Sequence, residues 1–169
     1  MYASGVCQRM ISLTMFGTCP GLSRSFWYSA GFSLRATTPP EIEVVLSRDA
    51  LWPPNHKMAD ITAEVTVTDI CDPMPTFVLT SITSDEPDNG LGDGDTADDI
   101  QGETAGTADV EFQLRSERAG GQDGRKYTII YTAMDMSGNT APDTACVLRP
   151  SRVSNSLAVV GCGALGGTV

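Results

Sequence analysis

The sequence predicts an all-β protein, built as an antiparallel β-sandwich of about seven strands with poorly structured N- and C-terminal tails. Three observations lead to this prediction. Between residues 41 and 150, several short runs alternate apolar and polar side chains with a period of two, as a strand with one buried face does. Clusters of turn-forming residues separate these runs. No segment of useful length in this region has the period of a helix, so a sandwich is expected, with a β-barrel as the alternative.

The expected strands can be placed individually. Residues 61–68 alternate strictly, with Ile, Ala, Val and Val on one face and Thr, Glu, Thr and Thr on the other, and residues 110–115 alternate in the same way. The most apolar run, 127–134, is expected to be central. Further strands are predicted at 42–46, 76–83 and 144–148. Six or seven short strands joined by turns favour immunoglobulin-like topology.

Two local features fit this arrangement. Tyr127 opens the central run just after the Gly-rich segment 120–124, which is the position of a tyrosine corner, so its hydroxyl is expected to bond back to the backbone. The segment Asp135-Met-Ser-Gly-Asn139 is expected to be a hairpin turn, because Asn or Gly can adopt positive φ and Asp or Ser can bond the backbone.

Composition divides the chain into three parts. Residues 1–40 contain no acidic residue and no steady period, and they are interpreted as an irregular leader or a fragment of an upstream domain that ends in the linker Thr37-Thr-Pro-Pro40. Residues 41–150 are expected to form the sandwich. Residues 151–169 are weakly apolar and Gly-rich, and they are expected to be a frayed tail.

The charge distribution limits the partners. All 21 acidic residues lie between Glu41 and Asp143, and with its eight basic residues the segment 41–152 carries a net charge of −13. Such a surface repels phosphate backbones, so no nucleic-acid partner is expected. There is no run of 18 apolar residues, so no membrane-spanning helix is expected.

The cysteines give no metal or redox motif. Five are scattered along the chain without a C-x-x-C pair, which argues against a zinc site, and their odd number leaves at least one unpaired within the chain. Only Cys71 and Cys146 fall in the segment expected to fold. A bridge between them requires the fold to bring them together.

Residues 86–99 are the most polar part of the chain, with six carboxylates and four Gly or Asn among fourteen residues. Oxygen-rich loops bent by Gly are how Ca²⁺ is usually held, so this acidic loop is either a calcium site or a solvated loop. Its spacing does not match an EF-hand, so a second loop would have to supply Asp123 or Asp135. The candidate calcium ligands in the loop itself are Asp88, Asn89, Asp93, Asp95, Asp98 and Asp99.

The remaining constellations favour structural roles. Gly90, Gly92 and Gly94 lack the spacing of a phosphate-binding loop, and the acids between and after them would repel the phosphate. His56, the only histidine, is expected to bond a backbone group within its turn, and Trp52 is expected to cap one end of the core.

Nothing in the sequence points to catalysis. No two carboxylates are marked as sharing a buried pocket, which is the arrangement that separates their pKa values, so no catalytic residue is assigned. Arg115, Arg118 and Arg125 are expected to offset nearby acids at the surface.

Several long motifs occur in one order along residues 41–149: Leu51-Trp-Pro-Pro-Asn-His-Lys-Met58, Val67-Thr-Asp-Ile-Cys-Asp-Pro73, Ser84 to Thr96, Leu114-Arg-Ser-Glu-Arg-Ala-Gly120, Asp123-Gly-Arg-Lys-Tyr-Thr-Ile-Ile130 and Asp135-Met-Ser-Gly-Asn139. In these motifs the chain resembles the immunoglobulin-like repeat modules of bacterial secreted and surface proteins that open with Leu-Trp-Pro-Pro-Asn-His-Lys-Met.

This resemblance implies a non-catalytic, extracellular structural or adhesion spacer. Its partners would be neighbouring domains of a larger protein and, for an adhesion unit, other surface proteins or glycans. The alternative is an accessory, carbohydrate-binding domain of a secreted hydrolase. Fold alone does not choose between them.

The chain departs from the family pattern in its cysteines. Members often carry further cysteines in the strand after Cys-Asp-x-x-Pro and in the strand before Asp-x-Ser-Gly-Asn, where this chain has Phe77 and Ala133-Met134. The resemblance therefore implies that Cys71 has lost its usual partner.

Overall fold

The computed structural model describes residues 37–89, 96–119 and 124–150. Residues 1–36 and 151–169, which make up most of the predicted leader and the whole predicted tail, lie outside this range. All regular structure in the described residues is β. The strands are β1 (Glu41–Leu46), β2 (Met58–Thr68), β3 (Thr76–Ser84), β4 (Ile100–Gln101), β5 (Glu111–Arg115), β6 (Gly124–Met134) and β7 (Thr140–Pro150).

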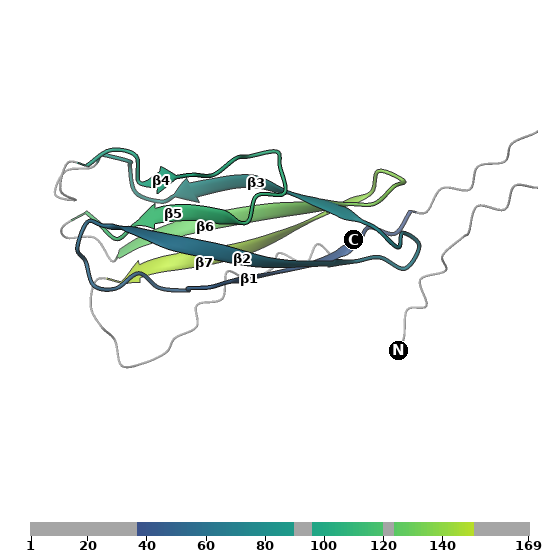
Figure 1. Cartoon of the computed structure of the whole chain (residues 1–169), viewed down its shortest axis with the longest axis horizontal. Coiled ribbons are helices and arrows are strands. Elements are labelled where there is room, and N and C mark those ends of the chain that lie inside the picture. Colours follow the sequence, from purple (N-terminus) through teal and green to yellow (C-terminus); the bar gives the residue numbers. More distant parts are fainter. Residues whose placement is uncertain (1–36, 90–95, 120–123, 151–169) are drawn as a thin grey trace, which may run out of the picture.

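The strands form two antiparallel sheets, one in the order β1-β2-β5-β4 and the other in the order β3-β6-β7. They run along the long axis of the molecule in two layers, with the turns gathered at the two ends (Figure 1). This architecture is consistent with the predicted sandwich. The predicted runs coincide with most or all of β1, β2, β3, β5 and β6 and with five of the eleven residues of β7, whereas the two-residue β4 was not predicted.

The core lies between the layers. β2 and β5 contribute Ile61, Ala63, Phe112 and Leu114, and they face Leu79, Tyr127, Ile129, Tyr131 and Val147 of the other sheet. The period of two explains this, because every second residue of β6 from Arg125 to Ala133 is buried. Tyr131 also packs edge-to-face on Phe77, with ring centroids 6.0 Å apart.

The two ends of the sandwich are different. At the N-terminal end, Asn139 Nδ2 donates to the carbonyl of Thr38 (3.4 Å), and the Asp72 carboxylate of the β2–β3 loop accepts from the amide of Met136 (2.8 Å). At the C-terminal end, Pro150 pairs with Gly124. The segments 47–57, 85–89, 96–99 and 116–119 all adjoin this second end (Figure 1).

The hairpin turn predicted at 135–139 is confirmed. Asp135 Oδ1 accepts from the amides of Ser137 (2.9 Å) and Asn139 (2.7 Å), and Gly138 adopts a φ of 88°. Burial alone would raise the pKa of Asp135, but hydrogen bonds from Asn139, Ser137 and Gly138 together outweigh burial and lower it.

Cys71 and Cys146 are both disulfide-bonded, so Cys71 has a disulfide partner although Phe77 stands where family members carry the usual one. Cys146 pairs in register with Thr128, six residues along β7 from Thr140, which is about 20 Å. Cys71 instead adjoins Asp72, which contacts the β6–β7 turn. The register therefore does not favour a bridge between these two cysteines, because bridged Cα atoms lie within about 7 Å.

The tyrosine-corner bond is also present. Tyr127 is fully buried, and its hydroxyl donates to the carbonyl of Arg115 (2.9 Å). Burial raises the pKa of Tyr127 to about 12.

We expect Tyr127→Phe to lower the free energy of unfolding by about 1–3 kcal/mol, because the buried carbonyl of Arg115 loses this donor where water cannot replace it. Tyr131→Phe is the matched control. It removes the bond to the carbonyl of Asp109 (2.8 Å), which is only partly buried, so water can compensate. Urea denaturation measures both losses, and equal losses would contradict this account.

Candidate functional site

Charged side chains are withdrawn from solvent at the C-terminal end of the sandwich, beneath the acidic loop. Asp99, Glu117 and Arg125 have exposed fractions of 1% or less, Arg115 is 9% exposed, and Glu86 is half-buried beside them. These five residues are called the charge cluster below. Buried charges are costly unless they are paired and hydrogen-bonded, so their arrangement needs a physical account.

Asp99 is the centre of the charge cluster. Its Oδ1 accepts from Arg115 Nε (3.0 Å), and its Oδ2 forms an ion pair with Arg125 Nη1. Arg115 ends β5 and Arg125 lies at the start of β6, so these two arginines belong to opposite sheets. One carboxylate from the β3–β4 connection therefore ties the two layers together.

The remaining guanidinium donors hold the loops. Arg115 donates to the carbonyls of His56 (3.1 Å), Ala97 (3.0 Å) and Asp98 (3.2 Å). Arg125 donates to the carbonyl of Pro87 (3.0 Å) and contacts Glu86 Oε2 (3.3 Å). Burial alone would lower the pKa of Arg125, but hydrogen bonds to Tyr127 and Asp99 outweigh it and raise this pKa.

Glu117 adds a second carboxyl beside Asp99. Burial and a hydrogen bond with Asp99 raise the pKa of Glu117 to about 7, and His56 opposes this shift. Glu117 Oε1 has no hydrogen-bond partner among the described residues, and a carboxyl oxygen buried without a partner favours the neutral form of the group. With Glu117 neutral, the two arginines are balanced by Asp99 and Glu86.

The structure corrects the role expected for His56. Its imidazole Nδ1 lies 3.2 Å from Glu117 Oε2, so the ring contacts a carboxyl group and not a backbone group. The turn is held instead through its main chain, because the His56 amide donates to the carbonyl of Ser116 (3.2 Å). His56 also adopts a positive φ of 56°.

The arginines expected at the surface are mostly internal. Arg115 and Arg125 are buried, contrary to the prediction, and Arg118 is half-buried with Nη1 on the carbonyl of Ala119 (3.1 Å). The burial of Arg125 could have been predicted from the sequence, because the period of two that buries Tyr127 and Ile129 places Arg125 on the same face.

The candidate calcium ligands separate into three groups. Asp88 and Asp99 are engaged internally: the Asp88 carboxylate accepts from the amides of Asp99 (2.8 Å) and Asp98 (3.1 Å), which lowers the pKa of Asp88, and Asp99 pairs with the two arginines. Asp98 and Asn89 are exposed. Asp93, Asp95 and Asp123 lie outside the described residues.

Asp135, the other proposed second-loop ligand, lies at the N-terminal end of the sandwich, whereas Asp88 and Asp99 lie at the C-terminal end. The structure therefore does not bring Asp135 to the acidic loop. Within residues 37–89, 96–119 and 124–150, no group of three or more His, Cys, Asp or Glu side chains is arranged to hold a metal ion.

Trp52 does not cap the core. Its side chain is 53% exposed, and the preceding Leu51 occupies the core position with 1% exposure. The guanidinium of Arg149, which is 1% exposed, lies over the indole with its Cζ 5.4 Å from the ring centroid. Burial lowers the pKa of Arg149, the nearby charge of Arg118 lowers it further, and Glu86 partly offsets both.

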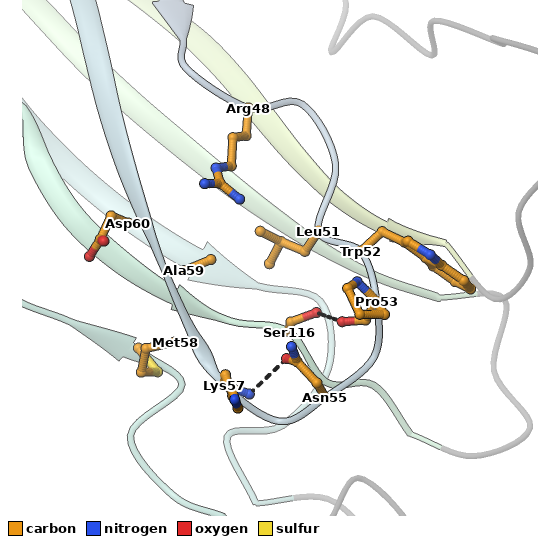
Figure 2. Close-up of a pocket in the computed structure, with 10 residues that line it drawn as sticks. All are labelled: Arg48, Leu51, Trp52, Pro53, Asn55, Lys57, Met58, Ala59, Asp60 and Ser116. Atoms are coloured by element: carbon orange, nitrogen blue, oxygen red, sulfur yellow. Dashed lines mark hydrogen bonds between the residues drawn. The ribbon is translucent and has the colours of Figure 1, made fainter.

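A hollow of about 210 Å³ lies between the loop that carries Trp52 and the start of β2 (Figure 2). In Figure 2, Arg48 points across the hollow above Leu51 and Ala59, and Trp52 projects from the outer side of the loop, away from Arg48. The lining residues are Arg48, Leu51, Trp52, Pro53, Asn55, Lys57, Met58, Ala59, Asp60 and Ser116.

Comparisons with known proteins found no matching family model, curated protein or solved structure. In the part of the chain that the structure describes, no helix is long and apolar enough to cross a membrane. Function therefore has to be argued from the described geometry.

We expect Glu117→Gln to remove part of the pH dependence of stability. The pKa of Glu117 rises from 4.5 to about 7 on folding, so its stabilising contribution is complete below about pH 4.5 and is lost as the pH rises through about 7. Between these limits the unsubstituted chain should lose roughly 2–3 kcal/mol that the Gln variant retains. Urea denaturation across this pH range measures the difference.

Glu111→Gln is the control for this comparison, because Glu111 is an exposed carboxylate on β5. This control should keep the pH dependence of the unsubstituted chain. If Glu117→Gln kept the same slope as well, the buried carboxyl would not be its source.

Proposed function

We propose that this chain is a non-catalytic structural and adhesion spacer module of an extracellular bacterial protein. The observation that carries the proposal is the position of its ends: the chain enters beside the β6–β7 turn at Thr38 and leaves at the other end of the long axis, at Pro150. A module with this geometry extends a tandem chain by its full length.

The strand order supports an immunoglobulin-like assignment within this proposal. One sheet has the order β1-β2-β5-β4 and the other β3-β6-β7. If the strands are lettered A to G along the chain, these orders correspond to the A-B-E-D and C-F-G sheets of a constant-type immunoglobulin domain. The hydroxyl of Tyr127, bonded to the backbone near the start of β6, occupies the expected corner.

The N-terminal end offers a surface for a neighbouring domain. Ile70 and Met74 of the β2–β3 loop are 66% and 81% exposed, and Met136 of the β6–β7 turn is 77% exposed. Asp72 joins this loop to this turn, so the three apolar side chains lie on connected segments beside the point where the chain enters. Exposed apolar groups of this kind are commonly covered at interfaces.

The charge cluster supports a structural role over a catalytic one. Asp99 and Glu86 face arginines and backbone amides, and Glu117 faces Asp99 and His56. Groups committed to one another in this way stabilise a fold, whereas a general acid or base must reach its substrate.

Mechanical loading tests the spacer proposal. The full chain, with its disulfides reduced and held through handles at its two ends, should resist force as one unit and unfold in a single step that releases roughly 40 nm of chain for residues 37–150. Force spectroscopy measures this release. Extension without a force peak, or release in several unrelated steps, would count against a load-bearing module.

For the acidic loop we propose a solvated loop with a stem clamped by Asp88 and Asp99. We therefore expect the melting temperature of the full chain to be the same in millimolar Ca²⁺ and in EDTA. The alternative is a calcium-stabilised module in which Asp93, Asp95 and Asp123 complete the site. A Ca²⁺-dependent rise in melting temperature, with heat of binding in calorimetry, would select that alternative.

The second candidate function is an accessory, carbohydrate-binding domain of a secreted hydrolase. The half-exposed indole of Trp52 beside the hollow favours it, because aromatic faces bind sugars. The surrounding reading frame discriminates between the two functions. Tandem copies of this module would indicate a stalk, and an adjoining catalytic domain would indicate an accessory module.

A further inference from the structure

The polar groups that line the hollow beside Trp52 differ in whether they already have hydrogen-bond or ion-pair partners. Its acceptors are engaged: Asp60 Oδ1 accepts from Gln113 Nε2 (2.6 Å), Asn55 Oδ1 from the Lys57 amide (3.1 Å), and the Pro53 carbonyl from Ser116 Oγ (2.8 Å). Its two cations, Arg48 and Lys57, are exposed, and their charged groups have no hydrogen-bond or ion-pair partner among the described residues. The Asp60 carboxylate keeps its charge when it accepts from the neutral Gln113 amide, so the hollow offers a ligand two cations against one anion.

The indole of Trp52, at the margin of the hollow, is held in place by a contact with Arg149. Arg149 lies against one face of Trp52 at 5.4 Å, and this arginine is buried with its Nε unpaired among the described residues. The contact orients the ring before any ligand arrives, which reduces the entropy lost on binding. A buried guanidinium whose charge is only partly offset also adds positive potential beneath the ring.

The layout favours an extended ligand over a compact, drug-sized one. A hollow of about 210 Å³ is small for a drug-sized molecule, since such sites usually span about 300–1,000 Å³. Arg48 and Trp52 also point in different directions from the same loop (Figure 2), so one small molecule cannot contact both fully. An extended chain with repeated anionic groups can reach the two cations and the indole together.

We propose that Arg48, Trp52 and Lys57 form a binding surface for an acidic polysaccharide whose sugars carry carboxylates. One sugar packs its C–H face on the indole, and carboxylates of neighbouring sugars pair with Arg48 and Lys57. The net charge of −13 on segment 41–152 opposes this weakly, because charges more than about 8 Å away are screened at physiological salt. The inference goes beyond the spacer role, and it can fail while the mechanical test succeeds.

The test is binding of the full chain to polygalacturonate, with a neutral glucan of similar length as the comparison, by isothermal calorimetry near physiological salt. We expect binding to polygalacturonate and at least tenfold weaker binding to the glucan. Trp52→Ala and the double variant Arg48→Gln/Lys57→Gln should each weaken polygalacturonate binding at least tenfold, whereas Trp52→Phe should retain most of it.

Two control variants test whether the loss of any exposed cation, or of any exposed apolar side chain, weakens binding. Lys126→Gln removes an exposed cation from β6, and Met136→Ala removes an exposed apolar side chain at the opposite end; both should bind normally. Melting curves confirm that each variant is folded. The proposal is overturned by no binding to polygalacturonate, by equal binding to the neutral glucan, or by binding that the Trp52 and Arg48/Lys57 variants leave unchanged.

Discussion

The C-terminal end of this sandwich depends on the pairing of the Asp99 carboxylate with two arginines. The carboxylate is buried between a guanidinium from β5 and a guanidinium from β6, and the spare donors of those arginines hold carbonyls of the 47–57 and 85–99 loops. Breaking a buried ion pair from one side typically costs about 3–5 kcal/mol, a large share of the 5–15 kcal/mol that keeps a domain folded. The loops at this end are therefore stabilised by these ion pairs and hydrogen bonds in addition to apolar packing.

The two ends of the molecule serve different physical purposes. The N-terminal end exposes Ile70, Met74 and Met136, which gain by being covered. The C-terminal end pairs Asp99 with two buried arginines and exposes an oriented indole beside two cations that have no partner among the described residues. A joint between domains and a contact with a ligand can thus occupy opposite ends without competing for the same surface.

Sequence reasoning recovered what local periodicity and turn chemistry determine. Alternation located β2 and β5, and the position of Tyr127 predicted its bond to the backbone. It missed β4, because two residues carry no period. It named Asp99 as a candidate calcium ligand but did not find its ion pairs, since the two arginines lie 16 and 26 residues away and only the folded register brings them together. The buried face of Arg125 could have been predicted by extending the period of β6 by one more pair.

The internal pairing of Asp99, Arg115 and Arg125 has a consequence for how the sequence can change over time. A single substitution at any of the three removes a partner from at least one buried, charged neighbour, whereas replacing such a group together with well-packed apolar residues is often neutral or stabilising. The path between these two solutions passes through intermediates of low stability. We therefore expect related sequences to keep Asp99, Arg115 and Arg125 together, even where the exposed loops around them diverge.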